Sequence, residues 1–275
     1  MAKTTAGRNQ SKRILACGDF HCGSVCGLTP PHWQIRHDDC STTKRNKFAA
    51  LQAELWDYFV NERKTLGPID IAILNGDLID GRGKDKAMGT EHFTSDRQEQ
   101  CDIAVWIIKH VIKPKHCIIT KGTTFHVGAD GEDFENLIAQ RVGAEKIGAH
   151  EWLDVNGVVF DCKHHLGSSS IPHGRYTAAA RDALWNTLWA VRGEQPKASV
   201  IIRSHVHYFT ACTDGRILAM TLPALQGIGT KYGSLRCSGT VDFGFVHFDV
   251  DAKGRYVWQA HLAEIAAQKA QALSL

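Results

Sequence analysis

The chain has 275 residues, of which 43% are hydrophobic and 22% charged, and its formal net charge is +3. This length suits one large α/β domain with a sizeable core, and the charge excludes an acidic or polybasic tail protein without requiring or forbidding a nucleic-acid partner. No apolar run approaches the roughly 18 residues of a membrane span, and none follows the polar start, so we expect neither a membrane anchor nor a signal peptide.

Cysteine and histidine are the informative residue types. The nine cysteines are an odd number scattered along the chain, which argues against a disulfide framework and favours a reducing cytosol. Cys22 and Cys26 are spaced as half of a structural zinc site, but no second close pair follows, so buried free thiols are the preferred interpretation. The fifteen histidines point to metal or acid–base chemistry.

Strands and helices alternate along the first half of the chain. Short apolar runs predict buried strands, and apolar residues at helical spacing predict helices. In chain order the sequence predicts strand 13–18, helix 48–60, strand 69–74, helix 98–113 and strand 116–120.

The second half adds hairpins to this pattern. In chain order we expect a hairpin over 154–160, a helix over 175–192, a strand over 198–202, and turns at 213–216 and 251–254. Parallel units followed by hairpins predict an α/β fold of two mixed sheets packed as a sandwich, with helices outside. We expect a flexible basic N-terminus over 1–12, one domain over 13–263 and a tail over 264–275 that forms a weak helix or frays.

Polar side chains follow each predicted strand. They are Asp19 and His21, then Asp77, then the segment from Thr123 to His126, then His164 and His165, and finally His205 and His207. Ligands gather at this edge of α/β sheets, and a two-residue spacing on extended chain puts both members of a pair on one side. Carboxylates and imidazoles suit Mn, Fe or Zn, and a carboxylate can bridge two ions.

This order of motifs resembles the calcineurin-like metallophosphoesterases over residues 19–207, and segment 19–31 is similar to their small phage and prophage members. The resemblance implies a four-layer fold that holds two divalent ions, with Mn first and Fe, Zn or Ni as alternatives. Asp19, His21 and His207 would bind the first ion, and Asp77 would bridge both. His205 and one histidine of the 164–165 pair would hold the second; His164 is preferred because it comes first after the strand.

The third motif departs from the family pattern. Thr123 stands where the family has a metal-binding asparagine, and His126, which we take as the general acid or transition-state donor, comes two residues late. The second ion would then complete its shell with Thr123, water or substrate. Asp80 is interpreted as a turn residue rather than a ligand.

The resemblance implies a phosphoester hydrolase that acts through a metal-bridging hydroxide. We expect a phosphodiester or nucleotide substrate; the alternatives are a DNA nuclease and a non-catalytic metal-binding interaction protein. Arg175, Lys231 and Arg236 would contact the anionic substrate or else be solvated surface charges, and loops 82–97 and 228–240 would cap the metals. The expected partner is a small phosphorylated substrate or nucleic acid, in the cytoplasm of a bacterial or phage-infected cell.

Overall fold

The structure is a computed structural model that describes residues 10–36, 43–81, 91–127, 133–167, 169, 171–228, 239–269 and 272–273. Its first sheet has the strand order β11-β10-β1-β2-β3-β4. These strands are β1 (Lys12–Cys17), β2 (Ile69–Asn75), β3 (Pro114–Thr120), β4 (Lys146–Gly148), β10 (Gly244–Val250) and β11 (Tyr256–Leu262). Strands β1 to β4 run parallel, and β10 pairs antiparallel to β1 and β11.

The second sheet has the order β5-β6-β7-β9-β8. Its strands are β5 (Glu151–Val155), β6 (Val158–Cys162), β7 (Val200–Arg203), β8 (Thr210–Thr213) and β9 (Leu218–Thr221). Strands β6, β7 and β9 run parallel, while β5 and β8 are antiparallel edges. The helices are α1 (Thr43–Thr65), α2 (Arg97–Ile107) with its π-helical continuation η3 (Ile108–Ile112), α3 (Thr124–Val127), α4 (Phe134–Val142), η4 (Pro172–Gly174), α5 (Arg175–Val191) and η5 (Ala266–Gln268).

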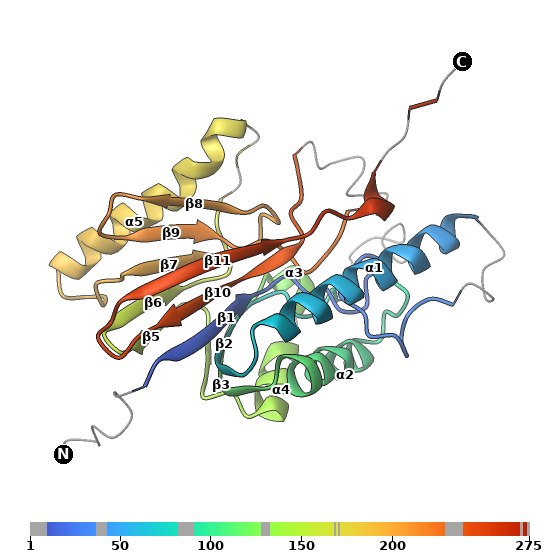
Figure 1. The fold of residues 1–275 in the computed structure, drawn as a ribbon, viewed down its shortest axis with the longest axis horizontal. Coiled ribbons are helices and arrows are strands. Elements are labelled where there is room, and N and C mark those ends of the chain that lie inside the picture. Colours follow the sequence, from blue (N-terminus) through green and yellow to red (C-terminus); the bar gives the residue numbers. More distant parts are fainter. Residues whose placement is uncertain are drawn as a thin grey trace.

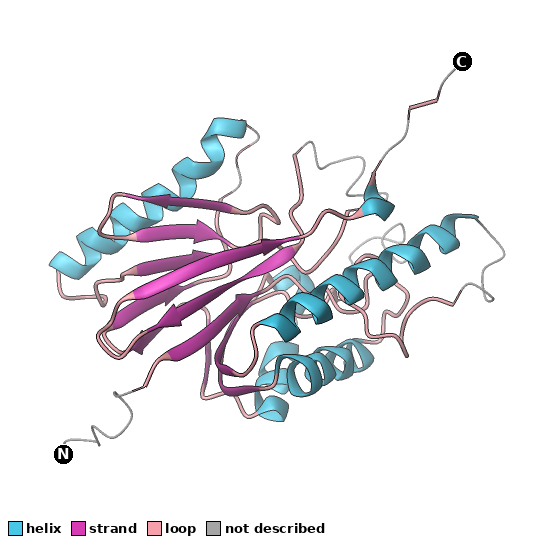
Figure 2. Cartoon of the chain, viewed as in Figure 1, coloured by secondary structure: helices cyan, strands magenta, loops and turns pink. Residues whose placement is uncertain are grey.

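Three apolar clusters separate four layers. One lies between the first sheet and helices α1, α2 and α4, another between the two sheets, and the third between the second sheet and α5. Successive strand residues alternate between clusters: Leu15 packs in the first and Ile14 in the second, as the two-residue period of a strand requires. Figures 1 and 2 show the strands in the middle with helices on both outer faces.

The predicted α/β sandwich of two mixed sheets with flanking helices is confirmed. The structure differs from the prediction in detail: α1 begins at Thr43, the helix after Arg97 becomes π-helical over its last turn, and β3 begins at Pro114. The short elements α3, α4 and β4 were not predicted. In the described part of the tail, Ala266–Gln268 form the turn η5. Among the described residues no helix has the length and apolar character of a membrane span.

Candidate metal centre

The carboxyl ends of β1, β2, β3, β6 and β7 carry the residues that the sequence singled out. Five of them have a left-handed backbone: Asp19 (φ 50°), His21 (φ 46°), Asp77 (φ 52°), His205 (φ 74°) and His207 (φ 56°). For residues other than glycine this conformation costs on the order of 1–3 kcal/mol each and is typical of functional sites. The strain therefore concentrates on the predicted ligands.

The first group of converging ligand atoms comes from Asp19, His21 and His207. Oδ1 of the fully buried Asp19 lies 3.2 Å from Nε2 of His207, 3.8 Å from Nε2 of His21 and 3.9 Å from Nε2 of His164. Among the described residues, this oxygen meets no hydrogen-bond donor in good geometry. A buried carboxylate oxygen without a donor is unfavourable unless a cation pairs with it.

The second group is formed by Asp77, His164 and His205. Nε2 of His164 lies 3.0 Å from Oδ2 of Asp77. Asp77 also belongs to a third group with His21 and His126, so it faces both the first and the second sets of histidines. Asp77 therefore takes part in two of the three candidate groups of the described residues.

Hydrogen bonds fix the orientation of three of the imidazole rings. Nδ1 of His164 donates to the carbonyl oxygen of Asn75 (2.7 Å), and Nδ1 of His126 donates to the carbonyl oxygen of Asp80 (2.8 Å). Nδ1 of His21 donates to the Asp80 carboxylate (2.7 Å). Because these acceptors carry no proton, Nδ1 of each ring bears it, and Nε2 of a neutral ring keeps its lone pair for the site.

The electrostatics of the centre favour added positive charge. Burial alone would lower the pKa of His21, but the nearby Asp19 carboxylate and the hydrogen-bonded Asp80 carboxylate raise it to about 10. Burial is likewise outweighed at His164, where Asp19 and Asp77 raise the pKa to about 9. Burial would raise the pKa of Asp77, but His164 and His126 lower it to about 2. Carboxylates that hold protons on buried imidazoles create the negative potential that suits a cation.

The imidazoles of His205 and His126 have lowered pKa values instead. Burial and the neighbouring His164 lower the pKa of His205 to about 4, and burial with the neighbouring His21 lowers the pKa of His126. Both rings are therefore neutral near pH 7. A neutral ring can bind a metal ion, whereas a proton donor must first gain a proton.

Two positions beside Asp77 must be glycine, because the backbone there passes too close to the candidate ligands for a Cβ atom. A Cβ on Gly122 would lie 2.1 Å from Oδ1 of Asp77, and a Cβ on Gly76, whose φ is 80°, would lie 2.6 Å from Nδ1 of His164. Either side chain would displace a candidate ligand.

Asp80 has a larger role than the turn residue that the sequence suggested. Its carboxylate accepts from Nδ1 of His21 (2.7 Å) and lies 2.8 Å from Nε2 of His92, and it is buried. Carboxylates of this kind fix the tautomer and orientation of a ligating imidazole. Asp80 thus orients His21, and none of the candidate ligand groups among the described residues includes it.

Thr123 and His165 lie beside the ligand groups rather than within them. The backbone N–H of Thr123 donates to Oδ1 of Asp77 (2.7 Å), and its hydroxyl lies 3.2 and 3.3 Å from the two oxygens of that carboxylate. His165 is exposed, and its ring lies 4.7 Å from that of His205. The geometry therefore favours His164 over His165 as the ligand.

The predicted substrate contacts are placed only in part. The Arg175 guanidinium lies 4.3 Å from the centre of the Tyr208 ring, next along the chain from His207, and donates to the Thr240 hydroxyl (2.7 Å). Lys231, Arg236 and most of loops 82–97 and 228–240 lie outside the described residues.

The described part of the chain places no cysteine in a metal-ligand group. Cys22 and Cys26 are buried free thiols there, as the preferred interpretation had it.

The carboxylate oxygens and imidazole nitrogens of the candidate ligand groups are a donor set that fits two divalent ions. Asp19, His21 and His207 could hold one ion, and Asp77, His164 and His205 the other; Asp77 also converges with His21, a member of the first group. Nitrogen and carboxylate ligands of this kind suit Mn, Fe or Zn.

Three supporting residues were missed by the sequence analysis: Asn75, His92 and Glu135. Asn75 is fully buried, and its side chain donates to the Ser204 hydroxyl (2.7 Å) and accepts from the Thr120 hydroxyl (2.8 Å). It joins the ends of β2, β3 and β7. Asn75 lies within the Asn-Gly-Asp turn after β2, and that position was the only sequence signal for it.

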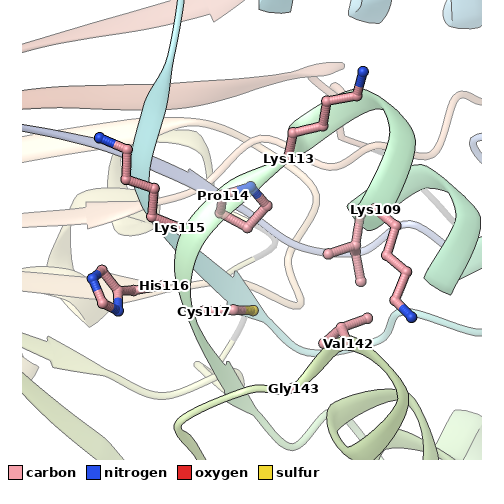
Figure 3. A pocket seen from close by; sticks show the side chains of 9 residues that line it. Lys109, Lys113, Pro114, Lys115, His116, Cys117, Val142 and Gly143 are labelled. Atoms are coloured by element: carbon pink, nitrogen blue, oxygen red, sulfur yellow. The ribbon is translucent and has the colours of Figure 1, made fainter.

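A separate depression of about 270 Å³ lies at the opposite end of β3 (Figure 3). Lys109, Lys113, Lys115 and His116 line it, but Figure 3 shows their charged tips pointing apart. Two helices, η3 and α4, end there, and lysines near helix carboxyl ends complement the exposed carbonyl groups. This depression is not a convergent anion site.

Comparison with known proteins gives remote likenesses only. No family model and no curated protein matches the chain. Vps29 from Entamoeba histolytica complexed with Zn²⁺ is 14% identical at a TM-score of 0.41, covering 90% of this chain and 99% of that one. Vps29 from Cryptosporidium parvum is 11% identical (TM-score 0.44, 92% and 98% covered), as is a novel archaeal phosphodiesterase (TM-score 0.44, 90% and 99% covered). Likenesses this weak assign neither ligand nor activity, which rest on the residues of this chain.

Proposed function

We propose that the protein is a dimetal-dependent phosphoester hydrolase acting on a phosphodiester or nucleotide substrate. The observation that carries the proposal is the position of Asp77, whose carboxylate belongs to one candidate ligand group with His164 and His205 and to another with His21 and His126. A single structural ion would need only one such group. A shared carboxylate between two sets of imidazoles is the arrangement that two-metal phosphoesterases require.

Divalent ions held by these residues would bind phosphoryl oxygens and lower the pKa of a water molecule towards neutrality. The protein residues hold this geometry in place. Asp80 and Asn75 fix the rings of His21 and His164, so that their Nε2 atoms face the carboxylates. Rigid support of this kind lets the ligands act without reorganisation during the reaction.

We assign His126 to the leaving-group side of the centre. Its Nδ1 is anchored on the Asp80 carbonyl group, which leaves Nε2 as the functional nitrogen. A bound phosphoryl group adds negative charge, and negative charge raises the pKa of a nearby imidazole. The ring can then take up the proton that the leaving oxygen needs.

The deciding experiment combines metal analysis with turnover of a bis-aryl phosphodiester and the matching monoester. We expect two divalent ions per chain, activity that rises with added Mn²⁺, and preference for the diester. Rapid degradation of single-stranded or duplex DNA at physiological salt would favour the nuclease instead. Stoichiometric metal without turnover of any of these substrates would indicate the non-catalytic metal-binding protein.

A further inference from the structure

A buried carboxylate behind the metal centre belongs to none of the candidate ligand groups of the described residues. Glu135 lies in the first turn of α4, which packs against β3 and α2 (Figure 1), and it is fully buried. Its Oε1 accepts the backbone N–H of Leu78 (3.1 Å), and its Oε2 accepts the backbone N–H of Gly122 (2.6 Å). One side chain thus ties the loop after β2 to the loop after β3.

Those two loops carry the shared carboxylate and its neighbour. Leu78 follows Asp77 directly, and Gly122 precedes Thr123, whose N–H donates to Oδ1 of Asp77 (2.7 Å). Glu135 thus contacts the backbone of both loops, and each loop is joined to Asp77: one through the chain at Leu78, the other through the N–H of Thr123. Movement of either loop would change the direction in which Asp77 offers its oxygens.

We propose that Glu135 is a positioning residue that holds Asp77 in the orientation needed to share two metal ions. This inference rests on the proposed function, since it assumes that Asp77 binds metal. Glu135 acts through backbone groups and touches neither ion.

The choice of a carboxylate at this position supports the inference. Burial and the nearby charge of Asp77 raise the pKa of Glu135 to about 7, so the negative charge is unfavourable there without added cations. A carboxylate supplies the two acceptor oxygens that the two N–H groups need, but it also brings a like charge near Asp77. Bound divalent ions would offset the repulsion between the two carboxylates.

The test compares Glu135→Gln with Glu54→Gln. In Glu135→Gln one of the two acceptor oxygens becomes an NH₂ group, which cannot accept a hydrogen bond from a backbone N–H. Glu54 is a matched control because its carboxylate also accepts two backbone N–H groups, those of Ala266 (2.6 Å) and Ala267 (2.8 Å), and neither adjoins a site residue. Both proteins are titrated with Mn²⁺ by calorimetry and examined by electron paramagnetic resonance, with thermal unfolding measured in chelator.

We expect Glu135→Gln to weaken Mn²⁺ binding about 10- to 100-fold, as loss of a supporting contact typically does, and to lose the spin-coupled signal of a metal pair. Glu54→Gln should keep both. A folded Glu135→Gln variant with wild-type affinity and a wild-type coupled signal overturns the inference. If that variant does not fold, Glu135→Asp replaces it: weaker Mn²⁺ binding supports the role and wild-type binding overturns it. A wild-type protein that binds no metal pair overturns the proposed function itself.

Discussion

Nε2 of His164 lies 3.0 Å from Oδ2 of Asp77, while Nδ1 of the same ring donates to the Asn75 carbonyl group. The ring is almost wholly buried and therefore has one available orientation. His165, the next residue, points instead to the exposed side and lies over His205. Of the two neighbouring histidines, only His164 belongs to a candidate ligand group of the described residues.

This relationship predicts different effects for two neighbouring substitutions. His164→Gln should lower the affinity of the second metal ion by more than the roughly 10- to 100-fold expected from loss of a supporting residue. His165→Gln should leave both ions bound, because its ring is not directed at Asp77. Calorimetric titration with Mn²⁺ measures both, and equal losses in the two variants would contradict the assignment.

Asp77→Asn should abolish most of the activity while the fold survives. The amide keeps the shape of the side chain but carries no charge to share between two ions. A loss of about 1,000-fold in kcat/KM is expected, equivalent to about 4 kcal/mol of transition-state stabilisation. Asp154→Asn, an exposed carboxylate of β5, is the control. Near-wild-type turnover of Asp77→Asn in Mn²⁺ would refute the dimetal assignment.

The sequence predicted β1, β2 and β3 because each contains a short apolar run with polar residues after it. Runs such as Ile69–Asn75 need no long-range information to be recognised as buried strands. Helix α4 was missed because Phe134–Val142 is short and follows a glycine-rich segment. The π-helical turn at Ile108–Ile112 was missed because its apolar residues read equally well as α-helix.

The candidate ligand residues were recognisable in the sequence because their types are distinctive and they stand at strand ends. Their supports were not. Glu135 reads as an ordinary acidic residue of a first helical turn, and only its complete burial against two loops marks it. Asp80 read as a turn residue because its partner His21 lies 59 positions away along the chain.

A buried polar network under α5 should contribute strongly to stability. Asp161 accepts from Arg203 (2.8 Å) and Asn186 (3.1 Å), and lies 2.8 Å from Nε2 of His150. Asp161→Asn should lower the free energy of unfolding by about 3 kcal/mol at pH 7, because it leaves a buried guanidinium with one fewer partner. Urea unfolding measures the change, with the exposed Asp57→Asn as the control.

The contribution of the Asp161 carboxylate to stability should depend on pH. Burial would raise the pKa of Asp161, but His150 and Arg203 outweigh it and lower the pKa below the usual 3.8. A carboxylate whose pKa is lower in the folded protein stabilises it above the unfolded pKa, and this stabilisation is lost as pH falls through the folded value. The stability difference between wild type and Asp161→Asn should therefore shrink as pH falls below about 4. A difference that stays constant down to pH 2 would contradict this account.

The irregular third motif leads to a prediction about the second metal ion. The resemblance noted in the sequence implies that Thr123 takes the place of a metal-binding asparagine, and its hydroxyl lies 3.2 Å from Oδ1 of Asp77. A hydroxyl is a weaker metal ligand than an amide oxygen, so the second ion should bind less tightly than the first and be partly lost on purification. Thr123→Asn should tighten it about tenfold, or about 1.4 kcal/mol. Thr123→Val, which removes the hydroxyl at constant shape, should weaken it. Calorimetry with Mn²⁺ resolves the two sites. Two equally tight sites in the wild type, unchanged in both variants, would mean that another side chain completes the second site.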